Sequence, residues 1–125
     1  PGDMNFQNPL DYFKGFLDEL FQYALNKRWV LYMFVLMSQA RRSDGVPKHI
    51  RELACTVNQI EQSAEIIEAG QKYGYFREGN PMALAFAFWS SVQGVMEQLA
   101  VSPELIENGD IPQTEWFIDI IRGVK

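Results

Sequence analysis

Hydrophobic side chains recur at intervals of three and four residues along most of this chain, which is the period of an α-helix with one buried face. The first such stripe follows Asn8-Pro9, a capping residue and a residue favoured at the first helical position. Its members are Leu10, Phe13, Leu17, Leu20 and Ala24. We therefore expect a helix that begins at Pro9.

A second helix is expected over residues 28–42. Its centre, Trp29–Met37, is a run of nine consecutive apolar residues. A membrane span needs about twenty such residues, so the run is more typical of a helix at the centre of a bundle. A buried strand is the alternative, but the pattern offers it no partner strand.

Three further helices are expected over residues 47–73, 80–100 and 113–124, with a loop over 102–111. The stripe of the first of these continues through Ile60, Ala64 and Ile67, and Asn80-Pro81 repeats the capping pair of the first helix. No segment alternates with the period of two that is typical of a strand. The pattern predicts an all-α fold, a five-helix antiparallel bundle-like domain.

The composition fits a single folded domain. The chain has 125 residues, of which 47% are hydrophobic and 22% charged, and this mixture disfavours a disordered chain or an integral membrane protein. The formal net charge of -5 argues against a basic surface for nucleic acid. The single cysteine, Cys55, excludes an internal disulfide.

The first residues suggest a boundary of the domain. Residues 1–8 lack the basic start and apolar run of a signal peptide, so we expect a cytoplasmic protein. The chain begins with Pro1 and not with Met, and we interpret residues 1–8 as the remnant of a linker after an upstream domain. The domain itself is expected over residues 9–125.

Residues that could support catalysis or bind metal are few. His49 and Glu52 lie one helical turn apart, and Glu61, Glu65 and Glu68 share a helix face, but a carboxylate-bridged metal site needs ligands from several helices. A solvated polar face is the favoured interpretation. We expect no metal, no cofactor and no enzymatic activity, and we interpret Cys55 as a packed thiol.

More specific motifs lie in the second half of the chain. They are Glu68-Ala69-Gly70-Gln71, the run 74–81 (Gly-Tyr-Phe-Arg-Glu-Gly-Asn-Pro), Phe88-Trp89, Val92-Gln93-Gly94 and the run 115–123. Their order resembles the C-terminal regulatory domain of the TetR family of bacterial transcription regulators. The resemblance covers roughly residues 9–124.

The resemblance implies a domain that binds a small apolar or amphipathic effector and forms a homodimer. Operator DNA would be bound only through an N-terminal helix-turn-helix domain, which this sequence does not contain, and the parent protein would be a repressor. Effector binding would change the spacing of the two DNA-binding heads.

The same resemblance, together with the helical pattern, assigns candidate residues. We expect an effector pocket among the first four helices, lined by Trp29, Tyr32, Met33, Met37, Leu53, Val57, Asn58, Phe86, Trp89 and Gln93. We expect the last two helices to form a four-helix bundle with a second copy, through Ala87, Ser91, Val92, Gly94, Val95, Trp116, Phe117, Ile120 and Ile121. The alternative is a stand-alone acidic interaction module that dimerises without a ligand.

Overall fold

The computed structural model describes residues 8–42 and 57–123 of the chain. Within these ranges the secondary structure is helical, with a single isolated backbone bridge between Phe76 and Arg122. The helices are α1 (Pro9–Asn26), α2 (Arg28–Arg42), α4 (Val57–Gln71), α5 (Pro81–Val101), α6 (Glu104–Glu107) and α7 (Thr114–Ile121). The predicted all-α fold is confirmed.

The helix starts follow the capping residues. The side chain of Asn8 accepts a hydrogen bond from the backbone of Leu10, and that of Asn80 accepts two, from Met82 and Ala83. Proline follows each cap, where its missing N–H is not needed.

Two expected boundaries are wrong. The expected loop 102–111 contains the short helix α6, and the last helix ends at Ile121 because Arg122 is extended. Residues 47–56 of the expected third helix lie outside the described residues, as does Val124.

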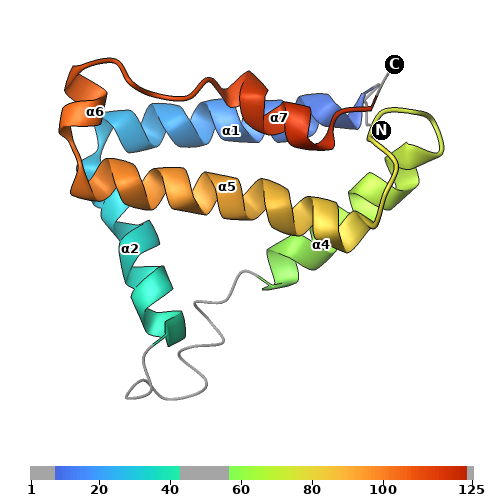
Figure 1. Cartoon of the computed structure of the whole chain (residues 1–125), viewed down its shortest axis with the longest axis horizontal. Helices are drawn as coiled ribbons and strands as arrows, with labels where there is room; N and C mark the ends of the chain where they lie inside the picture. Colours follow the sequence, from blue (N-terminus) through green and yellow to red (C-terminus); the bar gives the residue numbers. More distant parts are fainter. Residues whose placement is uncertain (1–7, 43–56, 124–125) are drawn as a thin grey trace.

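The helices are not arranged as a simple antiparallel bundle. Figure 1 shows α1 and α5 running in the same direction, with α7 running the opposite way and packing against both of them. α2 and α4, which come between them in sequence, pack against opposite ends of α5, and their other ends approach one another toward the lower edge of the view. The antiparallel arrangement is therefore found for α7 and not for α1 and α5.

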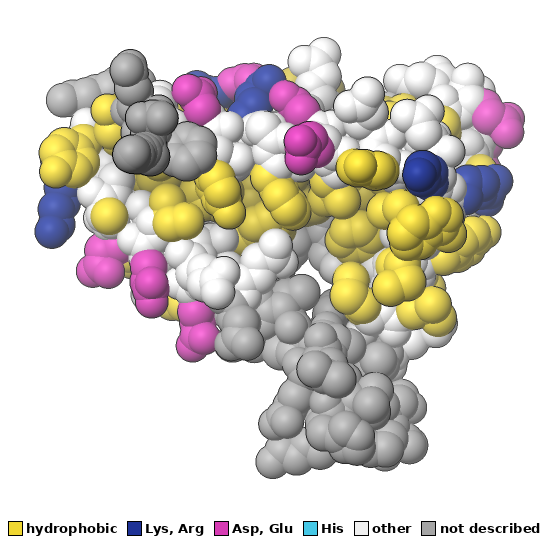
Figure 2. All heavy atoms as spheres, turned by 180° about the vertical axis from the view of Figure 1, so that it is seen from behind, with side chains coloured by type: hydrophobic (Ala, Val, Ile, Leu, Met, Phe, Trp, Pro, Cys, Tyr) yellow, Lys and Arg dark blue, Asp and Glu magenta, His cyan; other side chains and the backbone are white. Residues whose placement is uncertain are grey.

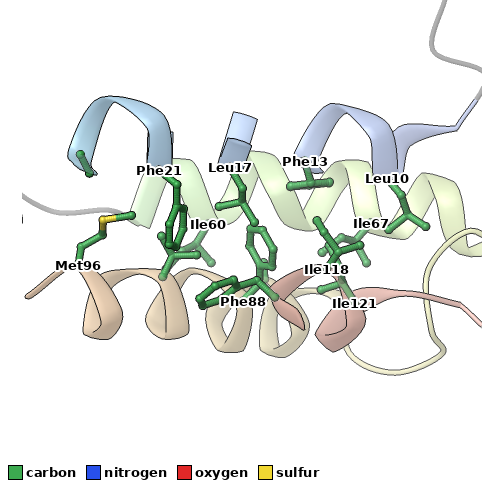
Figure 3. Packing of buried hydrophobic residues seen from close by; sticks show 14 of the residues in the cluster. Leu10, Phe13, Leu17, Phe21, Ile60, Ile67, Phe88, Met96, Ile118 and Ile121 are labelled. Carbon is green, nitrogen blue, oxygen red and sulfur yellow. The ribbon is translucent and has the colours of Figure 1, made fainter. Parts of the chain in front are cut away.

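The core lies where α1 meets α5 and α7. Phe13, Leu17 and Phe21 point from α1 toward Phe88 on α5, and Ile121 on α7 packs beside them (Figure 3). The Phe13 ring makes edge-on contacts with the rings of Phe76, at 5.8 Å, and Phe88, at 5.4 Å. Each large side chain buried in this way contributes roughly 1.5–3 kcal/mol to folding.

The segment that joins α4 to α5 is held in place by the packing of the Phe76 ring and by hydrogen bonds from the Gln71 side chain. The Phe76 ring is buried against the last turn of α4, where Gly70 leaves room for it. Gln71 donates from its side-chain amide to the carbonyls of Arg77 (2.9 Å) and Gly79 (3.0 Å). A β-carbon on Gly70 would overlap the Phe76 ring, so this helical glycine is required by packing.

We predict that Gly70→Ala destabilises the fold by about 1–3 kcal/mol, although alanine is the better helix former, because overpacking displaces a buried ring. Urea denaturation measures the change. Gly15→Ala is the matched control, since Gly15 lies in α1 with no atom within 4 Å of the new β-carbon, and it should stabilise by about 0.5–1 kcal/mol. Equal effects of the two substitutions would contradict the packing role.

Polar side chains attach the start of α7 to α1. The Thr114 hydroxyl donates to the Asp18 carboxylate at 2.6 Å, and Lys14 lies 3.3 Å from Asp18 and 3.8 Å from Glu115. The hydrogen bond from Thr114, and secondarily Lys14, hold the pKa of Asp18 below its ordinary value of 3.8, against the opposing effect of partial burial.

This contact predicts a pH-dependent contribution to stability. Because the pKa of Asp18 is lowered in the folded state, its contribution is complete above pH 3.8 and is lost as the pH falls through the folded-state pKa. Thr114→Val should cost about 0.5 kcal/mol near neutral pH, since the pair is half exposed. Denaturation curves between pH 6 and pH 2 should show the two proteins converging at the acid end. A constant difference over that range would exclude the contact as its source.

Candidate functional site

The candidate site is the junction at which α2 and α4 both pack against α5 (Figure 1). One side of this junction is built around Trp89. Its indole Nε1 donates to the Ser63 hydroxyl of α4 at 2.8 Å, and its ring packs edge-on against Phe16 of α1 at 5.4 Å. Trp89 thus joins three helices at one point.

The other side of the junction is built around Gln93, one turn further along α5. Its side-chain amide donates to the backbone carbonyl of Phe34 on α2 at 2.9 Å and to the carboxylate of Glu97 at 2.8 Å. Gln93 and Glu97 are half-buried. Close by in sequence on α2, the Ser38 hydroxyl is buried and makes no hydrogen bond.

The expected pocket residues separate into two groups. Trp89 and Gln93 lie in the junction, and Met37 is half-buried on α2. Trp29, Tyr32 and Met33 instead lie on the outer face of α2, with 64% of Trp29 exposed. Their role in binding stays a prediction, but the described residues do not place them as walls of an enclosed space.

Exposed apolar side chains also occur beyond α2. Figure 2 shows hydrophobic side chains as a band across the rear face, widening toward the end where α2 lies. Phe86, 61% exposed, lies in a shallow apolar groove of about 370 Å³ between α4 and α5, with Ile60, Met82 and Ala83. The remaining residues of the expected pocket are Leu53, Val57 and Asn58. Leu53 lies outside the described residues, and so do the side chains of Val57 and Asn58.

The expected interface residues also fall into groups that differ in burial: exposed, half-buried and core residues. Ala87 and Gly94 are exposed on α5, and Trp116 is 58% exposed on α7. Ser91, Val95 and Ile120 are half-buried.

Val92, Phe117 and Ile121 are core residues, and their assignment to an interface is wrong. Val92 lies one turn from the buried Phe88, on the face of α5 that packs inside the chain. Phe117 and Ile121 share the equivalent face of α7. A side chain that fills the core of its own chain offers no area to a second copy.

The sequence analysis missed Ser38, Ser63 and Glu97. Ser63 falls among the buried positions of α4, and Ser38 lies seven residues after the buried Leu31 on α2. The sequence did contain a signal for the two serines: each is a polar residue at a position where the helical period of hydrophobic residues predicts an apolar one.

The described part of the chain was also compared with the requirements of a metal site and of a membrane span. There, no group of three or more His, Cys, Asp or Glu side chains is arranged to bind a metal ion. His49, Glu52 and Cys55 lie outside that part. None of the described helices combines the length and the apolar character needed to cross a membrane.

Comparison with protein-family models, with curated proteins and with solved structures finds no match to this chain.

The Trp89–Ser63 hydrogen bond should contribute measurably to the α4–α5 contact. We predict that Trp89→Phe and Ser63→Ala are each destabilising, and that a double-mutant cycle gives a coupling energy of about 1 kcal/mol, because both groups are largely removed from water. Urea denaturation of the wild type, the two single variants and the double variant provides the cycle. Additive effects of the two substitutions would show that the hydrogen bond does not hold the helices together.

Proposed function

We propose that this chain is the effector-binding and dimerising domain of a TetR-type transcription regulator, with DNA binding supplied by a helix-turn-helix domain of the parent protein. The observation that carries the proposal is the division of α5 into two faces. One face, with Phe88, Val92 and Met96, is buried in the core. The other carries the small residues Ala87 and Gly94 and is exposed.

The exposed face of α5 is suited to a second copy of the chain. α7 packs against α5 and carries the exposed Trp116, so a large aromatic side chain is available for contact on the helix that neighbours α5. In a two-fold dimer the same surface serves both copies. An interface of this kind should bury on the order of 2,000 Å² in total.

A connection between the junction and α7 supports a regulatory role. The backbone N–H of Arg77 donates to Ile121 at 2.9 Å, and that of Gly123 donates to Tyr75 at 2.8 Å. The segment joining α4 to α5 is therefore bonded directly to the end of α7. A ligand that displaces α4 would move α7, and would favour one arrangement of the dimer if it bound that arrangement more tightly.

The second candidate function is an interaction module that binds no effector. The exposed apolar side chains of α2 favour it, because Trp29, Tyr32, Met33 and Leu36 recur at helical spacing on one outer face. The two functions differ in ligand binding. A thermal-shift screen with alkyl and aromatic probes separates them, since a ligand of the folded state raises the melting temperature. No shift with any probe would favour the module.

We predict that the chain is a dimer at micromolar concentration and that Gly94→Glu makes it a monomer. No atom lies within 4 Å of a β-carbon placed on Gly94, so the new side chain fits a single copy. In the dimer it would be an unpaired buried charge, which costs about 3–5 kcal/mol. Light scattering should show the mass falling from twice 14.4 kDa to 14.4 kDa.

The control for this experiment is Gly15→Glu. It introduces the same charge at another helical glycine with open space around it, on the exposed surface of α1. The Gly15 variant should remain dimeric. A monomeric wild type would refute the dimer, and a dimeric Gly94→Glu variant would exclude this face of α5.

A further inference from the structure

α2 carries an exposed apolar face with basic side chains at one end. On the side of the helix opposite to the buried Leu31, four large side chains are exposed at the spacing i, i+3, i+4 and i+7: Trp29, Tyr32, Met33 and Leu36. α2 contains no Asp or Glu, and Lys27 and Arg28 are exposed at its start. These two cations lie over the rings of Tyr23 and Tyr32 and form no ion pair with a described residue. Trp, Tyr, Met and Arg are the side chains enriched at contacts between proteins.

A groove of opposite charge lies between α4 and α5. One end is the apolar hollow of about 370 Å³ that contains Phe86, and a second hollow of about 450 Å³ shares Met82 with it. Three exposed side chains of α4 line the second hollow: Glu61, Glu65 and Glu68. α4 contains no Lys or Arg, and none of the three carboxylates is paired with a described residue. This α4–α5 groove is therefore apolar toward Phe86 and acidic toward Glu68.

The helix face and the groove match in length and in the direction of their polarity. Seven residues of an α-helix span about 10.5 Å, which is the length of residues 29–36 on α2 and of residues 61–68 on α4. α2 is basic at Arg28 and apolar further along, whereas the groove is acidic along α4 and apolar at Phe86. An amphipathic helix with anchors at these four spacings is a recurring occupant of an apolar groove on a protein.

The groove is out of reach of α2 in its own chain. α2 and α4 pack against opposite ends of α5 (Figure 1), and the side chain of Gln93 holds the backbone of Phe34 on α2 against α5. The exposed face of α2 is the one turned away from this contact. A second copy of the chain supplies the same helix without that constraint.

We propose that the α4–α5 groove binds α2 of a second copy of the chain, with Arg28 directed toward the acidic end and Leu36 toward Phe86. The contact includes neither Gly94 nor Trp116 and goes beyond the proposed function. It involves one helix face, so it falls among small interfaces, which are weak. We expect a dissociation constant on the order of 100 µM, which leaves the contact unoccupied at low micromolar concentration.

The test uses the full chain with Gly94→Glu, which removes the proposed dimer and leaves both surfaces of this contact intact. Sedimentation equilibrium between about 10 µM and about 1 mM should show the mass rising above 14.4 kDa. Raising the salt concentration from about 0.05 M to about 0.5 M should weaken the association, because exposed charges meet in it.

Exchange of charges identifies the two surfaces. Arg28→Glu and Glu65→Lys, each in this background, should weaken the association about tenfold or more, because like charges then face one another. An equimolar mixture of the two variants should regain it, since the acidic helix of one chain meets the basic groove of the other and the reverse. Both variants keep a net negative charge, so a general attraction between them would not produce the recovery.

The matched control is Asp110→Lys, which makes the same change in charge at an exposed position between α6 and α7. It should associate as the parent does. Circular dichroism melting checks that each variant folds.

The outcomes that would overturn the proposal differ from those that bear on the proposed function. A constant mass of 14.4 kDa up to about 1 mM would overturn it, and so would an association that the mixture does not restore. Co-sedimentation with phosphatidylglycerol vesicles, lost in Arg28→Glu and seen without self-association, would assign the α2 face to a membrane surface instead. A wild type that is monomeric at micromolar concentration but associates in this charge-dependent way would refute only the proposed dimer.

Discussion

The described structure depends on the burial of Phe13 between Phe76 and Phe88. This one side chain joins the first helix to α5 and to the segment before it. The Phe76 ring in turn requires a glycine at position 70, and the backbone around Phe76 is bonded to the end of α7. Loss of this packing would release α7 as well as the α4–α5 connection, because both are fastened to the same residues.

The junction of α2, α4 and α5 differs from this core in its hydrogen bonding. In the core, apolar side chains from α1, α4, α5 and α7 fill the space. In the junction, Trp89 and Gln93 are satisfied by Ser63 and by the Phe34 carbonyl, but Ser38 is not satisfied. A helix contact that retains an unpaired buried hydroxyl has given up some stability.

The two faces of α5 explain how one helix could serve both packing and association. Its buried face includes Phe88, Val92 and Met96, and its exposed face includes the small residues Ala87 and Gly94, which permit a close approach of another helix. α7 lies against α5 and is bonded to the connection that follows α4. Under the proposed function, movement at the junction would therefore reach the dimer surface through backbone hydrogen bonds.

The sequence by itself determined the helical class and the helix starts, because capping at Asn8 and Asn80 and the spacing of apolar residues are local properties. The period also placed Trp89 and Gln93 on α5 where they contact other helices, and their role in ligand binding stays a prediction. Only the tertiary structure decided the parallel course of α1 and α5, the early end of α7 and the exposure of Trp29 and Phe86. Those features depend on which helices meet across the fold. An apolar residue in a uniformly apolar helix such as α2 gives no local signal of which side will be covered.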